Sequence, residues 1–165
     1  KNLAALIRAF ERLKKHSGLP HGLVIAGSRG WGADKILRLA GQSERASEIR
    51  MIDYVDPDDK AALYALAELF VYPSFYEGFG FPPLEAMSAG TPVVASHAGS
   101  LSEVLGDAAV FANPDNPAEI AAEMEAGLTD ETLRQNLRNR SANILEKYSW
   151  EKAGQEFLRL INKII

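Results

Sequence analysis

Two carboxylates, Glu77 and Glu85, flank a glycine-containing turn and the expected start of a helix. Gly78 and Gly80 let backbone amides approach a ligand closely, and amides at the beginning of a helix carry partial positive charge, which favours phosphate. Carboxylates beside a phosphate are unfavourable unless they accept hydrogen bonds from hydroxyl groups. A ligand with phosphate in its middle and hydroxyls at both ends, the layout of a nucleotide sugar, satisfies both conditions.

A second glycine-rich loop, residues 27–32, follows an apolar run and precedes a helical pattern. A glycine-rich loop in this position could be a dinucleotide-binding loop, whose glycines are spaced Gly-x-Gly-x-x-Gly. Here the spacing is Gly-x-x-Gly-x-Gly, so a dinucleotide-binding loop is rejected. Arg29 is a candidate phosphate ligand, with plain solvation as the alternative, and Trp31 is expected to be a packing residue. His97 has the residue type of a general base, but no acid partner stands near it, so an ordinary loop position is favoured.

Hydrophobic spacing gives the elements that must hold these loops. Apolar residues at three- and four-residue steps predict helices, and short apolar runs bounded by glycine or proline predict buried parallel strands. The expected helices cover residues 3–17, 32–41, 57–66, 83–89, 117–127, 130–148 and 149–165, and the expected strands cover residues 22–27, 49–55, 68–72, 91–95 and 107–111. This alternation predicts a single α/β domain, a Rossmann-like doubly wound parallel sheet with helices on both faces, whose ligands bind beyond the carboxyl ends of the strands.

The last expected helix has an apolar stripe containing Trp150 and Phe157, for which a place in the core against the sheet is favoured. The terminal pair Ile164 and Ile165 could instead dock on a partner domain. Charged residues of the preceding helix are expected to form a solvated face, namely Arg134, Arg138 and Arg140.

Composition excludes several classes of protein. The chain of 165 residues is 47% hydrophobic and 24% charged, which is typical of a globular domain and not of a disordered chain. Its net charge of -4 argues against a general nucleic-acid surface. With no cysteine there is no thiolate metal site and no cysteine nucleophile, and no apolar run approaches the length of a spanning helix. A cytoplasmic location is expected, and the start at Lys1 suggests a piece of a longer polypeptide.

The segment from Glu77 to Met87, together with residues 89–95, closely resembles the Glu-x7-Glu motif of the retaining family-four glycosyltransferases. The resemblance is specific because it includes the Phe-Gly turn, the Glu-Ala-Met helix and the Gly-Thr-Pro-Val-Val strand. It extends to the Lys-Asn-Leu start of the chain and to residues 62–74. It therefore covers essentially the whole sequence, as the C-terminal lobe of a two-lobed GT-B enzyme.

The resemblance implies a role for individual residues. Glu85 is similar to the carboxylate that binds the ribose hydroxyls, and Glu77 to the one beside the donor sugar. Lys1 is similar to the basic residue that neutralises the leaving diphosphate. The further donor-binding residues implied are Gly78, Phe79, Gly80, Phe81, Leu84, Tyr54, Val55, Gly27 and Arg29. The simpler alternatives are a helix-dipole contact for Glu85, an exposed loop position for Glu77 and solvation for Lys1.

The resemblance also implies a reaction. A hexose, with mannose from GDP-mannose favoured over a UDP-linked sugar, would pass with retention to a glycan or lipid-linked acceptor, without a metal or other cofactor. Residues 1–165 would bind the donor, while an N-terminal lobe outside this sequence would bind the acceptor and could bring the enzyme to a membrane surface. The alternatives are a non-catalytic nucleotide-binding or interaction domain, and a sugar-nucleotide epimerase or phosphorylase of the same fold.

Overall fold

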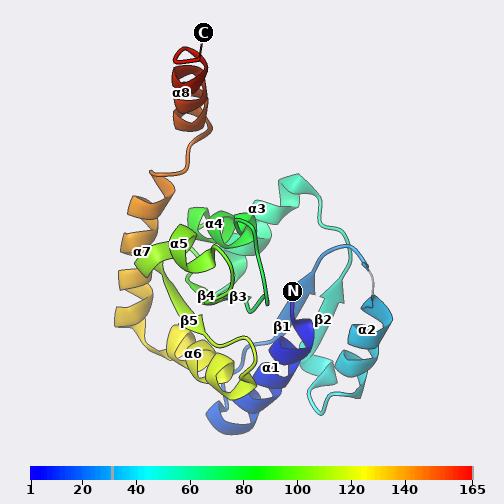
Figure 1. The fold of residues 1–165 in the computed structure, drawn as a ribbon. Coiled ribbons are helices and arrows are strands. Elements are labelled where there is room, and N and C mark those ends of the chain that lie inside the picture. The colour runs from blue at the N-terminus through cyan, green and yellow to red at the C-terminus, as the bar shows by residue number, and fades with distance from the viewer. Residues whose placement is uncertain (31, 165) are drawn as a thin grey trace.

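The computed structural model describes residues 1–30 and 32–164, so the expectations for Trp31 and Ile165 lie outside the described residues. Helices and strands alternate through the first two-thirds of the chain, and helices alone follow (Figure 1). The strands are β1 (Leu23–Ala26), β2 (Ile49–Ile52), β3 (Phe70–Tyr72), β4 (Val93–Ser96) and β5 (Ala109–Ala112). The helices are α1 (Leu3–Ser17), α2 (Ala33–Gln42), α3 (Pro57–Leu66), α4 (Phe81–Ser88), α5 (Leu101–Leu105), α6 (Pro117–Thr129), α7 (Glu131–Leu145) and α8 (Trp150–Ile161), with 3-10 turns η1 (Ala46–Glu48) and η2 (Gly106–Ala108).

All strand pairs are parallel, which confirms the predicted α/β class. The strands form two sheets: β1 pairs with β2, and β4 lies between β3 and β5. In the second sheet Val93 is aligned with Phe70 on one side and with Ala109 on the other. No strand hydrogen bonds join β1 to β3 in the described part of the chain, so the expectation of one continuous sheet is corrected to two.

Two hydrophobic clusters hold the sheets, and the three-stranded sheet contributes to both, because Ala112 of β5 and Val71 of β3 belong with the first cluster. The first surrounds α1, whose Ile7 and Phe10 are buried together with Leu23 and Ile25 of β1 and with Ile120 of α6. α1 and α6 lie side by side at the lower part of Figure 1. The second cluster covers the three-stranded sheet with residues of α4, α5 and α7. Both clusters hold the carboxyl ends of their strands, where the candidate ligand-binding loops begin.

β1 departs from the expected fully buried strand. Leu23 and Ile25 are buried, whereas Val24 and Ala26 are exposed, so only one face of this strand contacts the core. A continuous apolar run had predicted burial of both faces, because parallel strands usually carry helices on both sides. In this structure residues of α1 and α2 share the first hydrophobic cluster with β1 and β2, and α3 packs against α4 instead.

Caps explain where two of the helices begin. The Asp56 side chain accepts a hydrogen bond from the amide of Asp58 at the start of α3, with Pro57 in the first turn, as the sequence predicted. α4 begins at Phe81, two residues before the expected start, because Gly80 adopts the left-handed conformation and turns the chain into the helix. α5 and η2 were not expected, and they shorten the predicted fifth strand at its beginning.

α8 contradicts the expectation of a core helix. Figure 1 shows it standing away from the rest of the chain, and none of its residues is buried. Trp150 is 86% exposed and Phe157 is 62% exposed, so neither packs against a sheet. Amphipathic spacing identified the helix correctly but not the surface that its apolar side contacts.

Candidate functional site

Glu77 lies at the centre of a polar cluster built from three elements. Lys1, at the beginning of α1, places its Nζ 2.7 Å from Glu77 Oε1 and also donates a hydrogen bond to the hydroxyl of Tyr72, the last residue of β3. The Glu77 side chain is 15% exposed and that of Lys1 is 56% exposed. The structure therefore brings together two residues that were assigned separate roles, and Glu77 is not the exposed loop residue of the simpler alternative, while Lys1 is ion-paired but still more than half exposed.

Hydrogen bonds keep this cluster ionised. Burial opposes the charged form of Glu77, but the hydrogen bond from Lys1, together with the hydroxyl groups of Ser74 and Tyr72, outweighs it and lowers the pKa of Glu77. Burial likewise opposes the charged form of Lys1, yet its bonds to Glu77 and Tyr72 raise the pKa of Lys1. Burial is the first cause that raises the pKa of Tyr72, which stays a neutral hydroxyl. The site thus presents a carboxylate and an ammonium group side by side.

The backbone of Glu77 is fixed by the loop after β4. The Ser100 amide and hydroxyl both donate to the Glu77 carbonyl oxygen, each at 3.2 Å. Gly99 lies so close that a Cβ atom there would stand 2.4 Å from the same oxygen. Gly80 is equally constrained, because a Cβ atom would stand 2.5 Å from Leu101. The turn that carries Glu77 therefore depends on two glycines whose side-chain space is already occupied.

The start of α4 supplies few amides. Pro82 and Pro83 lie in its first turn and have no N–H, so the donors available here come from Phe81 and the residues of the preceding turn. Gly78 is exposed and has open space around it. The Phe79 ring packs against Phe81, with ring centroids 4.9 Å apart. The Leu84 side chain is buried in the second cluster and therefore does not face a ligand.

Glu85 forms a separate cluster with α3. Its Oε1 is 2.7 Å from Lys60 Nζ, and its Oε2 accepts a hydrogen bond of 3.0 Å from the Tyr64 hydroxyl. Burial and this bond to Glu85 raise the pKa of Tyr64 above its usual value. A cavity of about 380 Å³ lies beside them, lined by Pro57, Lys60, Ala61, Tyr64, Ala65, Glu85, Ser88 and Ala89. Both Glu85 oxygens are therefore oriented toward α3 next to an open cavity.

Arg29 and Asp53 form the third polar group. Arg29, after β1, makes two hydrogen bonds of 2.8 and 3.1 Å to the carboxylate of Asp53, which follows β2. The bonds to Asp53 raise the pKa of Arg29. The amide of Gly27 donates to the carbonyl of Asp53, so both strand ends are tied together. Tyr54 beyond them is exposed and Val55 is half-buried. Arg29 would have to share or leave its partner to bind phosphate.

Several residues of these clusters carried no functional assignment in the sequence. Lys60 and Tyr64 are four positions apart on α3 and so share a helix face, a spacing that was available in the sequence. Tyr72 and Ser74 flank the carboxyl end of β3, and only the register of the folded sheet shows that they meet Glu77. Among the described residues no group of His, Cys, Asp and Glu could hold a metal ion.

The remaining sequence candidates have structural roles. The His97 ring stacks on Phe111 at 4.9 Å, which agrees with an ordinary loop position. Arg134 is not on a solvated face: its side chain is largely buried and it forms ion pairs with Glu68 and Glu131. Arg138 donates to the Gly90 carbonyl, and Arg140 donates to that of Asp107, so α7 is tied to the preceding loops.

The ionisation of Glu77 gives a pH prediction. Folding lowers its pKa below the usual 4.5, so its contribution to stability is present above that value and is lost as the pH falls through the lowered pKa. Lys1→Met removes the hydrogen bond from Lys1 to Glu77, so the free energy of unfolding should decrease less steeply as the pH falls. Denaturant titrations between about pH 3 and pH 6 measure this slope. Lys35→Met, which changes an exposed lysine of α2, is the control. Equal slopes for both variants would contradict the prediction.

No helix among the described residues is both long and apolar enough to cross a membrane. The model of the family described as glycosyl transferases group 1 matches residues 1–144. O-antigen chain mannosyltransferase B of Escherichia coli is 41% identical over 151 residues, covering 92% of this chain and 40% of that protein. MMP alpha-(1->4)-mannosyltransferase of Mycolicibacterium hassiacum is 31% identical over 170 residues, covering 100% of this chain and 40% of that protein.

Solved structures of glycosyltransferases are also similar to this chain. A sucrose-phosphate synthase from Thermosynechococcus elongatus superposes with a TM-score of 0.82 at 25% identity, over 99% of this chain and 42% of that one. A glycosyltransferase from Rickettsia africae superposes with a TM-score of 0.88 at 16% identity, over 99% of this chain and 44% of that one. The chain thus spans about two-fifths of these two structures and of the two relatives above. With its parallel α/β fold and its strand-end clusters, the chain belongs to the group 1 glycosyltransferases of the GT-B fold.

Proposed function

We propose that this chain binds a nucleoside-diphosphate sugar and, with an N-terminal lobe, transfers a hexose to a glycan or lipid-linked acceptor. Several relatives are named mannosyltransferases, which supports mannose from GDP-mannose as the donor. One of them is named for an alpha linkage, and the mannose of GDP-mannose is itself alpha-linked. An alpha product then corresponds to a retaining reaction.

The Lys1–Glu77 pair is the observation that carries this proposal. It joins the first residue of the sequence to the first glutamate of the Glu-x7-Glu segment at the carboxyl end of β3, next to the glycine turn that starts α4. A diphosphate near that turn would meet the ammonium group of Lys1 and the amides of the turn, which stabilise the negative charge of a leaving group. The Glu77 carboxylate is then placed to accept hydrogen bonds from the hydroxyls of the donor sugar.

The Glu85 cluster fits the other end of the donor. Two vicinal ribose hydroxyls need an acceptor with both oxygens oriented, and Lys60 and Tyr64 hold the Glu85 carboxylate in that way. The cavity beside it, about 380 Å³, has room for part of a nucleoside. Lys60 also compensates the charge of Glu85, which reduces repulsion of the diphosphate.

Nucleotide binding can be tested on the chain itself. GDP, UDP and ADP are titrated while the melting temperature is measured, because a ligand that binds only the folded chain raises it with concentration. We expect GDP to give the largest rise. Glu85→Ala should weaken GDP binding roughly 10- to 100-fold, since about two hydrogen bonds to a charged group are lost.

Glu125→Ala is the matched control, because it removes an exposed helical carboxylate of α6. Its GDP response should equal that of the unchanged chain. If no nucleoside diphosphate raised the melting temperature, the donor-site proposal would be wrong. If Glu85→Ala bound GDP as well as the control, the ribose contact would be wrong while the donor site remained.

A further inference from the structure

A line of three aromatic rings has Phe70 of β3 in its middle. The Phe70 ring stacks on the ring of Tyr72, with centroids 5.8 Å apart and ring planes at 23° to each other. On its other side the ring of Tyr64 meets it edge-on, with centroids 5.3 Å apart and ring planes at 83°. Both arrangements are favourable for aromatic pairs. Phe70 therefore contacts two tyrosine rings at once.

The two tyrosines serve different carboxylates. Tyr64 donates a hydrogen bond of 3.0 Å to Glu85 Oε2. The Tyr72 hydroxyl accepts a hydrogen bond from the ammonium group of Lys1, which itself lies 2.7 Å from Glu77 Oε1. The aromatic line thus runs from the Glu85 cluster to the Glu77 cluster.

The local structure explains why these rings meet. Phe70 and Tyr72 are two positions apart on β3, so their side chains lie on the same face of the sheet. The Phe70 amide donates a hydrogen bond of 2.9 Å to the Pro92 carbonyl, which fixes the start of the strand. The Tyr64 carbonyl accepts a bond of 2.6 Å from the Thr91 hydroxyl. All three rings pack with the second hydrophobic cluster, so they have little freedom to move apart.

The position of a tyrosine hydroxyl depends on what its ring contacts. The hydroxyl stands at the far end of a rigid ring, so a small tilt of the ring displaces it and its hydrogen bond. In the proposed donor complex the ribose meets Glu85 and the transferred sugar meets Glu77. Because a diphosphate of limited length joins these two parts, both carboxylates must be oriented at the same time.

We propose that Phe70 is a positioning residue that orients both donor-binding carboxylates through the hydroxyl groups of Tyr64 and Tyr72. One ring supports the group that holds Glu85 and the group that holds Lys1 beside Glu77. This inference rests on the proposed function, and it names a shared support for the two ends of the donor. A phenylalanine with only a packing role would change stability alone.

The Tyr72 side can be tested without any ligand. The ionisation of Glu77 is followed by NMR of ¹³C-labelled glutamate, assigned by comparison with Glu77→Gln. Phe70→Leu should raise the titration midpoint of Glu77 by about half a pH unit, about threefold, because Tyr72 no longer holds Lys1 in place. Tyr72→Phe, which removes only the hydroxyl, should give a similar rise, and the two changes together little more.

Phe111→Leu is the matched control. Phe111 is also a half-buried strand phenylalanine of the second cluster, but its ring stacks on His97. This variant should leave the Glu77 midpoint unchanged. Phe70→Met, which fills a similar volume without a ring, should shift the midpoint as Phe70→Leu does. Equal Glu77 midpoints in Phe70→Leu and Phe111→Leu, or an unshifted midpoint in Phe70→Met, would overturn the positioning role.

GDP titrations test the Tyr64 side. Phe70→Leu and Tyr64→Phe should each weaken GDP binding about fivefold, whereas Phe111→Leu should not. Together they should cost less than about tenfold, because the Tyr64 hydroxyl is already misplaced in Phe70→Leu, whereas independent effects would multiply to about 25-fold.

The outcomes separate this inference from the donor site. A loss of about 25-fold in the double variant would show that Phe70 does not act through Tyr64, while the donor site would stand. If GDP did not bind even the unchanged chain, the donor proposal would be wrong. The ligand-free titration of Glu77 would then still decide whether Phe70 positions Tyr72.

Discussion

Gly99→Ala should slow sugar transfer by about a hundredfold in the full-length enzyme, although Gly99 itself carries no reactive group. A Cβ atom at Gly99 would stand 2.4 Å from the carbonyl oxygen and 3.1 Å from the amide nitrogen of Glu77. These are backbone atoms, so they cannot rotate away as a side chain would. The loop that carries Glu77 must shift, and a misplacement of about 1 Å can cost about 10²-fold in rate.

Gly18→Ala separates this effect from backbone strain. Gly18 has φ +63° and Gly99 has φ +59°, so alanine is strained equally at both, but nothing lies within 4 Å of a Cβ atom at Gly18. The kcat for transfer, measured with the donor saturating, should fall only for Gly99→Ala, while both variants lose some thermal stability. A kcat for Gly99→Ala equal to that of Gly18→Ala would show that Glu77 does not depend on this contact.

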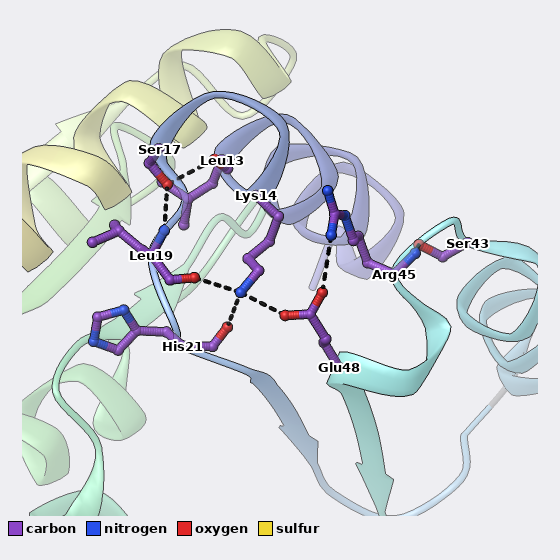
Figure 2. A network of polar contacts seen from close by, with 8 residues as sticks. All are labelled: Leu13, Lys14, Ser17, Leu19, His21, Ser43, Arg45 and Glu48. Carbon is purple, nitrogen blue, oxygen red and sulfur yellow. Dashed lines mark hydrogen bonds and ion pairs between the residues drawn. The ribbon is translucent and has the colours of Figure 1, made fainter.

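Lys14→Met should give the largest loss of stability among the substitutions discussed. Figure 2 shows the Lys14 ammonium group between three acceptors: the carbonyl oxygens of Leu19 and His21, at 2.5 and 3.0 Å, and the Glu48 carboxylate at 2.5 Å. The side chain of Lys14 is 7% exposed, so water does not replace these bonds when methionine removes them. Leaving two carbonyls without a charged donor should lower the free energy of unfolding by about 2–4 kcal/mol.

Lys15→Met is the matched control, since Lys15 is the next residue of the same helix and is exposed. Denaturant titration at neutral pH should show a clear loss for Lys14→Met and little change for Lys15→Met. The hydrogen bond from Lys14 is the first cause that lowers the pKa of Glu48, so Lys14→Met should also weaken the dependence of stability on pH below about 4.5. Equal stability of the two variants would contradict the proposed anchoring role.

The sequence predicted the features that depend on local spacing. The α/β alternation and the Asp56 cap follow from patterns within a few residues, whereas the contact between Lys1 and Glu77, 76 positions apart, appears only in the folded chain. The contacts of Lys14 could not be predicted in this way. A lysine on α1 looks like an ordinary solvated residue in the sequence, and only in the folded chain do the loop of residues 18–22 and η1 lie over it. Two of its three acceptors are backbone carbonyls, which no residue type reveals.

Errors of the sequence prediction also have a physical pattern. Trp150 and Phe157 are correctly placed on one side of a helix, but periodicity does not say what that side contacts. Tyr72 and Ser74 act on Glu77 because the chain turns back after β3, and a strand pattern shows no such turn. Leu84 illustrates the reverse: a residue inside a binding motif whose side chain serves the core.

The division into two sheets has a mechanical consequence. Backbone hydrogen bonds resist sliding within each sheet, but none connects β1 to β3 in the described part of the chain. The unit with Arg29 and Asp53 and the unit with Glu77 and Glu85 meet mainly through apolar contacts, which tolerate small shear displacements, and through a few side-chain bonds such as that of Lys1 to Glu77. A small displacement of one sheet relative to the other would therefore change the distance between these two groups of polar residues without breaking any strand pair.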